Sequence, residues 1–128
     1  MKKIFLPLDN NIIKRLRVGD ELLLSGTIYT ARDQAHKRLV ALIAKKKKLP
    51  IKLRDATIYY CGPTNTRPGG IIGSCGPTTS SRMDTFTVQL LKAGLKSMIG
   101  KGTRSKEIIS SIKRYKGIYL IASIMVGS

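Results

Sequence analysis

The hydrophobic and polar positions of this chain alternate between strand-like and helix-like spacing. Residues 3–6 are mostly apolar and predict a short strand, and Asp9 is a good N-cap for a short helix that Gly19 would end. From Asp20 to Tyr29 both alternating faces are largely apolar, which predicts a strand in the middle of a sheet.

The same alternation continues to the end of the chain. Thr30 is a natural N-cap for a helix that ends in the lysine run at 45–48. Further helices are predicted over 82–92 and around the apolar positions 108–115, and strands over 56–61, 96–99 and 117–122. Residues 62–81 form a long glycine-rich segment without periodicity, which in a compact domain is usually functional or mobile. Strands that alternate with helices indicate an α/β fold.

The segment from Cys75 to Asp84 combines a turn with a hydroxyl-rich helix start. Gly76-Pro77 interrupts the preceding structure, and threonines and serines follow at positions that suit a helix N-cap. Backbone N–H groups at a helix start are unpaired and carry partial positive charge, so together with Arg82 they offer a place for a carboxylate or phosphate. An ordinary capped helix with a solvated arginine explains the local pattern equally well.

A second cation, Arg32, is expected in the first turn of the helix that follows Thr30. An arginine there opposes the helix dipole, so an additional interaction should favour it. An anionic ligand would do so, and so would pairing with Asp33 or another carboxylate. His36 lies four residues further along the same side. A lone histidine in this position is more often a hydrogen-bonded packing residue than a catalyst.

A third cation, Lys101, lies between two glycines just before a predicted helix. This arrangement resembles a phosphate loop but lacks the Walker spacing, so it indicates an anion contact only. Arg32, Arg82 and Lys101 each follow a predicted strand. If the strand ends lie side by side, the three cations converge on a pocket suited to a small dianion. The pattern contains no convincing general-base carboxylate, nucleophilic triad or metal-ligand set, which indicates a half-site that needs a partner.

The charge of the chain raises a different class of function. The 24 lysines and arginines against 7 acidic residues give a net charge of +17, which is typical of nucleic-acid binding. Aromatic residues make up only 5%, tryptophan is absent, and the basic residues are scattered apart from the run at 45–48. A solvated basic face therefore accounts for the charge better than a nucleic-acid site does.

The length of 128 residues predicts a single domain over 1–128. No apolar run approaches the roughly 20 residues of a membrane span, and the basic start lacks the features of a signal peptide, so we expect a cytoplasmic protein. Cys61 and Cys75 are too few to build an iron–sulfur or zinc site unaided. In such a compartment both cysteines are expected to be reduced, although they could form a disulfide.

Four ordered blocks carry a resemblance to a known family. They are Gly26-Thr27-Ile28-Tyr29-Thr30-Ala31-Arg32-Asp33-Gln34-Ala35-His36-Lys37-Arg38, Tyr60-Cys61-Gly62-Pro63-Thr64, Gly76-Pro77-Thr78-Thr79-Ser80-Ser81-Arg82-Met83-Asp84, and Lys101-Gly102 with Ser105. Together they resemble the C-terminal domain of class I fumarases across about residues 18–123. The same domain occurs as a separate β subunit in two-subunit fumarases and L(+)-tartrate dehydratases.

The resemblance implies a swivelling β/β/α domain with a mixed sheet and flanking helices, and a hydro-lyase that interconverts fumarate and L-malate. It implies that this chain binds no cofactor or metal, and that an α subunit supplies a [4Fe–4S] cluster. A hetero-oligomer or a β homodimer is expected, with no membrane and no nucleic acid. The final strand is normally followed by several tens of residues, which this chain does not have.

The resemblance also implies roles for individual residues. Substrate carboxylates would be bound by Arg32, Arg82 and Lys101. Catalytic roles fall to Thr78, at the position of a threonine proposed to move the proton, and to Lys101. Supporting roles fall to Asp33, His36, Thr79 and Ser105. Three alternatives stay open: L(+)-tartrate as the substrate, a catalytically silent docking domain, and a basic nucleic-acid-binding module.

Overall fold

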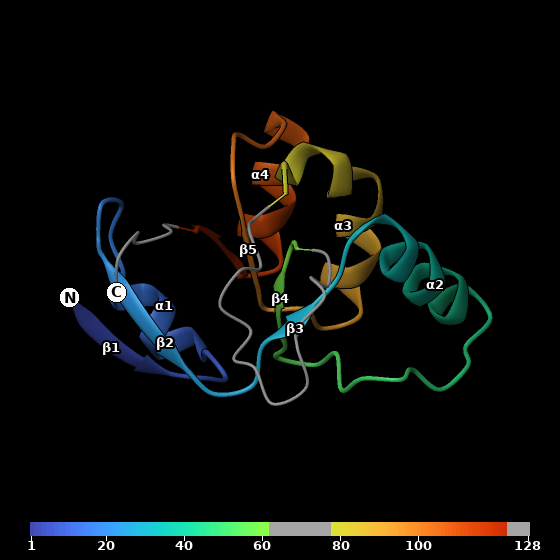
Figure 1. Ribbon diagram of the computed structural model, residues 1–128, viewed down its shortest axis with the longest axis horizontal. Helices are drawn as coiled ribbons and strands as arrows, with labels where there is room; N and C mark the ends of the chain where they lie inside the picture. The colour runs from blue at the N-terminus through green and yellow to red at the C-terminus, as the bar shows by residue number, and fades with distance from the viewer. Residues whose placement is uncertain (62–77, 123–128) are drawn as a thin grey trace, which may run out of the picture.

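The structure is a computed structural model that describes residues 1–61 and 78–122 (Figure 1). The glycine-rich segment of the sequence therefore lies almost wholly outside the described residues. The elements are β1 (Lys2–Phe5), α1 (Asn10–Arg15), β2 (Leu22–Ser25), β3 (Tyr29–Thr30), α2 (Asp33–Ala44), β4 (Thr57–Tyr59), the 3-10 helix η1 (Ser80–Met83), α3 (Asp84–Lys92), β5 (Ser97–Gly100), α4 (Lys106–Arg114) and β6 (Ile118–Ile121). No helix in the described ranges is long and apolar enough to cross a membrane.

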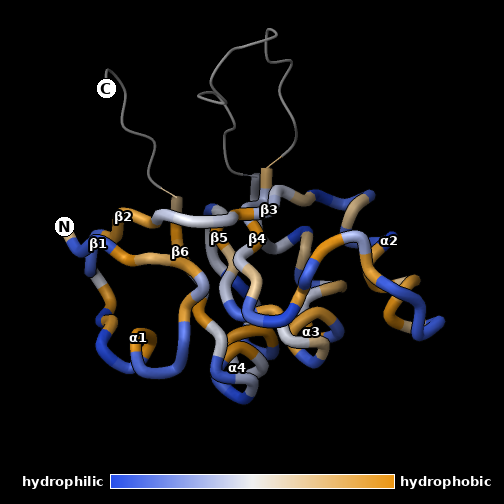
Figure 2. Tube along the Cα trace, turned by 90° about the horizontal axis from the view of Figure 1, so that it is seen from below, coloured by the Kyte–Doolittle hydropathy of each residue, from blue (hydrophilic) through white to orange (hydrophobic). Residues whose placement is uncertain are grey.

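The strands form two parallel sheets. β1 pairs with β2, and the second sheet has the order β3-β4-β5-β6. The α/β class is confirmed, but every pairing among the described strands is parallel, so the expected mixed arrangement is absent from this part of the chain. Figure 2 shows the strands in one layer with α3 and α4 beneath them, and α3 packs between α2 and α4.

The main core lies between the four-stranded sheet and helices α2, α3 and α4. Ile58 and Met98 of the central strands are fully buried, as is Leu90 of α3. Leu39 of α2 and Ile108 of α4 close the same cluster from the other helices. Full burial of each such side chain contributes about 1.5–3 kcal/mol, so this helix layer fixes the sheet that carries the strand ends.

The predicted strand over 20–29 is wrong in two respects. It splits into β2 and β3 at Gly26, whose φ of +129° takes the backbone out of the extended region. A Cβ on Gly26 would also lie 2.9 Å from the Leu6 Cβ, so only glycine fits this crossing. Neither part is central. Among the described strands β2 pairs only with β1, and β3 is an outer strand of the four-stranded sheet.

Two helices begin later than the sequence predicts. Thr30 lies in β3, and α2 starts at Asp33 with Arg32 in the N-cap position. Arg32 is therefore outside the first turn, and the acidic Asp33 complements the helix dipole there. In the same way, α3 starts at Asp84 because η1 occupies the preceding residues. The cap predicted at Asp9 is confirmed by its bond from the Ile12 N–H at 2.8 Å.

Candidate active site

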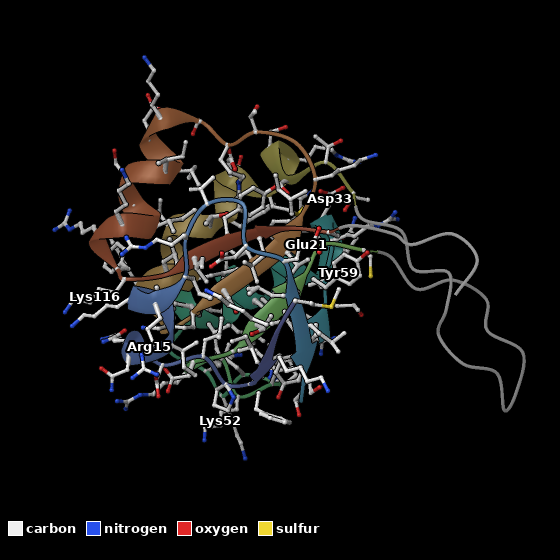
Figure 3. The ribbon with its side chains drawn as sticks, turned by 90° about the vertical axis from the view of Figure 1, so that its left-hand side faces the viewer. Arg15, Glu21, Asp33, Lys52, Tyr59 and Lys116 are labelled. Atoms are coloured by element: carbon white, nitrogen blue, oxygen red, sulfur yellow. The ribbon has the colours of Figure 1, made fainter. Side chains whose placement is uncertain are left out.

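The parallel order brings the carboxyl ends of β3, β4 and β5 to one edge of the sheet. Main-chain bonds continue past the strand ends, from the Ala31 N–H to the Tyr59 carbonyl at 3.1 Å and from the Tyr60 N–H to the Ile99 carbonyl at 2.8 Å. In Figure 3 Asp33 and Tyr59 lie at this edge, and Lys116 and Arg15 lie on the opposite side. The edge therefore gathers the segments that carry the three predicted cations.

The segment that carries Arg82 is joined directly to the segment that carries Lys101. Thr79 and Lys101 form a parallel β-bridge, and the Ser80 N–H donates to the Lys101 carbonyl at 3.0 Å. Gly100 permits this approach, because a Cβ there would lie 2.0 Å from Ser80 Oγ. An isolated bridge and one further main-chain bond thus attach the hydroxyl-rich segment to the chain directly after β5.

A tyrosine hydroxyl strengthens the same junction. Tyr119 of β6 donates to the Gly102 carbonyl at 2.8 Å, and Ser80 Oγ lies 2.6 Å from the Tyr119 oxygen. Because the one phenolic proton goes to Gly102, the Ser80 hydroxyl is the donor in the second bond. Ser80, which the sequence offers as a helix cap, instead ties η1 to β6.

Arg82 forms an ion pair with Asp33 of α2. The two side chains are 60% and 34% exposed, so the pair contributes roughly 0–1 kcal/mol to stability and leaves the guanidinium open to solvent. Asp33 therefore pairs with Arg82 and not with Arg32. Arg32 and Lys101 are both exposed, and neither has an ion-pair partner among the described residues.

His36 is buried behind these cations. Its Nδ1 lies 2.8 Å from the Arg32 carbonyl, so Nδ1 carries the proton and Nε2 is an acceptor with no partner in the described parts of the chain. Burial lowers the pKa of His36 below its ordinary value, which keeps the ring neutral at pH 7. The ring packs against Tyr60 and Phe86 at centroid distances of 5.4 and 5.8 Å. These contacts are those of a packing residue.

The remaining predicted residues lie around the same junction. Thr78 donates from both its backbone N–H and its Oγ1 to the Tyr60 carbonyl, each at 2.7 Å, so its hydroxyl proton is directed to the backbone. Thr79 is exposed. Ser105 caps α4 by accepting from the Ile108 N–H at 3.2 Å, and its own N–H donates to Asp84 at 3.4 Å.

Sequence reasoning missed Arg104, whose side chain is only 1% exposed. Its Nε donates to Asp84 Oδ1 at 2.7 Å, Nη2 donates to Thr87 Oγ1 at 2.8 Å, and Nη1 donates to the Tyr60 hydroxyl at 3.2 Å. Its guanidinium carbon also lies 5.2 Å and 5.0 Å from the ring centres of Tyr60 and Tyr119. No local signal identifies this network, because its partners come from strands and helices that only the fold brings together.

The described residues contain no group of three or more histidine, cysteine or acidic side chains that could hold a metal ion. Cys61 is disulfide-bonded, so the expectation of reduced cysteines is wrong for this residue, and Cys75 lies outside the described residues. A cavity of about 240 Å³ lies at the opposite edge of the sheet, lined by Tyr29, Thr57 and neighbouring residues, and includes none of the predicted site residues. The candidate site is therefore an open cationic edge in the part of the chain that the structure describes.

Comparison with known proteins identifies the family to which this chain belongs. Residues 2–126 match the family described as Fumarase C-terminus, and the chain belongs to this family. It is 35% identical to a Methanocaldococcus jannaschii protein provisionally named L(+)-tartrate dehydratase subunit beta, over 95% of this chain and 64% of that protein. It is 34% identical to the L(+)-tartrate dehydratase subunit beta of Escherichia coli strain K12, over 94% of this chain and 61% of that protein.

Fumarate hydratases also match. The anaerobic class I fumarate hydratase of Escherichia coli strain K12 is 43% identical over 80% of this chain and 19% of that protein. This chain therefore spans less than two thirds of each of these relatives.

Proposed function

We propose that this chain is the β-type half of a hydro-lyase that interconverts fumarate and L-malate. The single observation that carries the proposal is the junction between the Arg82 and Lys101 segments at the carboxyl edge of the sheet, beside the end of β3 that precedes Arg32. Two cationic side chains on adjoining segments match the two carboxylates of a C4 diacid better than they match a single anion.

The chemistry explains why cations are needed. Removing a proton from the carbon beside a carboxylate places negative charge on a group that is already anionic. Arg32, Arg82 and Lys101 would bind the carboxylates and disperse the charge that develops in the transition state. Cations already fixed in place need not reorganise as this charge develops, so removing one of them should lower kcat/KM.

Thr78 remains our proposed proton-transfer residue. Its hydroxyl proton is directed to the Tyr60 carbonyl in this structure, so the oxygen lone pairs face away from that bond. To take up a proton, the hydroxyl would have to be activated by the neighbouring cations. Asp33 would orient Arg82, and Thr79 and Ser105 would support the two loops.

A [4Fe–4S] cluster, which the family resemblance implies, does not fit the residues of this chain. The sequence has two cysteines, and the described residues hold no group of three metal ligands. We therefore propose that the cluster belongs to an α subunit and that this chain contributes the substrate contacts and the proton-transfer hydroxyl. No step assigned to this chain passes through the cluster.

L(+)-tartrate is the second candidate substrate. The two relatives named as tartrate dehydratase β subunits match 94–95% of this chain, whereas the fumarate hydratase match is more identical over a shorter stretch. Both substrates are C4 dicarboxylates, so the same cations would serve either. The one additional hydroxyl that tartrate carries relative to L-malate must be recognised by other residues.

The test is hydration of fumarate and dehydration of L(+)-tartrate by the anaerobic mixture of this chain with its cluster-bearing partner, against each protein alone. We expect activity on one substrate in the mixture only. Association without activity would leave a silent docking domain, and the absence of association would contradict the proposal. Binding of DNA that weakens steeply with salt would then support the nucleic-acid reading of the +17 charge.

A further inference from the structure

The buried guanidinium of Arg104 connects the two segments that carry the proposed carboxylate contacts. We propose that Arg104 is a positioning residue that fixes Arg82 relative to Lys101, and that it never touches the substrate. The proposal rests on the proposed function for its effect on substrate. Its geometric part can be tested without substrate.

The first half of the connection is to the start of α3. Asp84 accepts from Arg104 Nε at 2.7 Å and lies two residues beyond Arg82, where η1 runs directly into α3. Thr87 accepts from Nη2 at 2.8 Å and donates to the Met83 carbonyl at 2.9 Å. Two of the donors of Arg104 therefore hold the helical turn from which Arg82 projects.

The second half is to the strand ends and the Lys101 turn. Arg104 is three residues beyond Lys101 in the same connection to α4, so its anchorage limits where that turn can lie. Its guanidinium lies over the rings of Tyr60, directly after β4, and Tyr119, within β6, and donates to the Tyr60 hydroxyl at 3.2 Å. The Asp84 carboxylate completes the connection by accepting from the Ser105 N–H at 3.4 Å.

Burial and charge argue against direct substrate binding by Arg104. Its side chain is 1% exposed, and Asp84, itself only 19% exposed, offsets its charge. A planar fork with several fixed donors can hold three elements at once, which a lysine ammonium on a flexible stem cannot do with the same geometry. The role therefore depends on the shape of the guanidinium as well as on its charge.

The experiment compares Arg104→Lys with Arg114→Lys in the full chain. Arg114 is an exposed arginine of α4 whose guanidinium lies 5.6 Å from the Tyr115 ring, so it matches the chemistry of the change without the network. The first readout is the set of backbone amide resonances of the folded, substrate-free chain. We expect the signals of residues 81–82 and 101–102 to shift in Arg104→Lys and to stay in place in Arg114→Lys.

The second readout is steady-state kinetics of the complex with the partner subunit, well below the unfolding temperature. A displaced carboxylate contact should reduce kcat/KM by about ten- to a hundredfold. In an Arg82→Ala background the added Arg104→Lys change should have a smaller effect than it has alone, because it acts through the missing side chain. A purely structural role would lower the unfolding temperature and leave kcat and KM as in the wild type.

The outcomes separate the two proposals. Unmoved amide signals, or moved signals with unchanged kinetics in an active complex, overturn the role of Arg104. An inactive wild-type complex defeats the proposed function, and the amide signals then decide the geometric claim by themselves. Should Arg104→Lys fail to fold, Asp84→Asn weakens the same pair from the other side and is expected to shift the same signals.

Discussion

The Ser80 hydroxyl lies 2.6 Å from the Tyr119 hydroxyl, and this contact spans 39 positions of the sequence. Because Tyr119 also donates to the Gly102 carbonyl at 2.8 Å, one phenolic oxygen holds η1 and the Lys101 turn together. The relative placement of the two proposed carboxylate contacts thus depends on side chains that need not meet the substrate.

Replacing Tyr119 with phenylalanine should destabilise this junction. The buried Ser80 hydroxyl would lose its acceptor and the Gly102 carbonyl its donor, which we expect to lower the free energy of unfolding by about 1–3 kcal/mol. Urea unfolding measures the loss. Tyr115→Phe is the control, because the described residues contain no hydrogen bond from the Tyr115 hydroxyl, and equal losses in the two variants would contradict the interpretation.

Gly100→Ala should displace Ser80. The new Cβ would lie 2.0 Å from Ser80 Oγ and 2.9 Å from Tyr60 Cδ2, so we expect a loss of about 1–3 kcal/mol of stability from overpacking. The double variant Gly100→Ala with Ser80→Ala removes the closest atom and should recover part of that loss, as unfolding measurements would show. Simple additivity of the two single changes would count against a direct clash.

Acid should destabilise the fold partly through His36. Burial and the nearby Arg104 lower its pKa below the ordinary value of 6.5, and the Arg32 carbonyl and Asp33 oppose that shift only partly. The unfolded chain therefore takes up this proton first. Stability should fall as the pH drops below about 6.5, by at most about 1.4 kcal/mol per pH unit, until the folded pKa is passed.

The variant His36→Gln isolates this contribution. Glutamine does not titrate, whereas the carboxylates of Asp33 and the rest of the chain are common to both proteins. The quantity to follow is the unfolding free energy of the wild type minus that of the variant, measured from pH 8 to pH 5. It should decrease in acid and stay constant above pH 7. Parallel curves would show that His36 is not held neutral by the fold.

Arg82→Ala and Lys101→Ala should separate function from stability. Both side chains are exposed, so we expect each change to alter the unfolding free energy by less than about 1 kcal/mol. Activity of the complex should fall by about two to three orders of magnitude, the size of effect seen when a fixed donor to a developing charge is removed. Lys92→Ala, at the exposed end of α3, is the matched control and should retain activity.

The secondary structure was largely predictable because it depends on local spacing. Asp9 caps α1 as predicted, and the strand predicted over 56–61 and the helix predicted over 82–92 contain β4 and α3. The break at Gly26 was not predictable, because the continuous apolar pattern on both sides of it also describes one long strand. Only the packing of Leu6 against that glycine shows why the strand divides.

The site could be predicted only as a set of exposed segments. Arg32 and Lys101 follow β3 and β5, whose carboxyl ends lie at one edge of the sheet, and the Thr79–Lys101 bridge brings the segment of Arg82 to the same edge. The sequence could not show that Asp33 pairs with Arg82, because the two are 49 residues apart. The role of Arg104 could not be predicted either, because a buried arginine and a solvated arginine cannot be told apart in a sequence.

The parallel pairing of the strands also affects when, during folding, the segments of the site come together. Tyr29 pairs with Ile58, Thr57 with Ser97, and Ser97 with Ile118, so every pairing must close a long loop of chain before it gains a contact. Such distant pairings form slowly during folding. The cationic edge is assembled from segments that separate crossovers bring together, so we expect the complete site to appear late in folding.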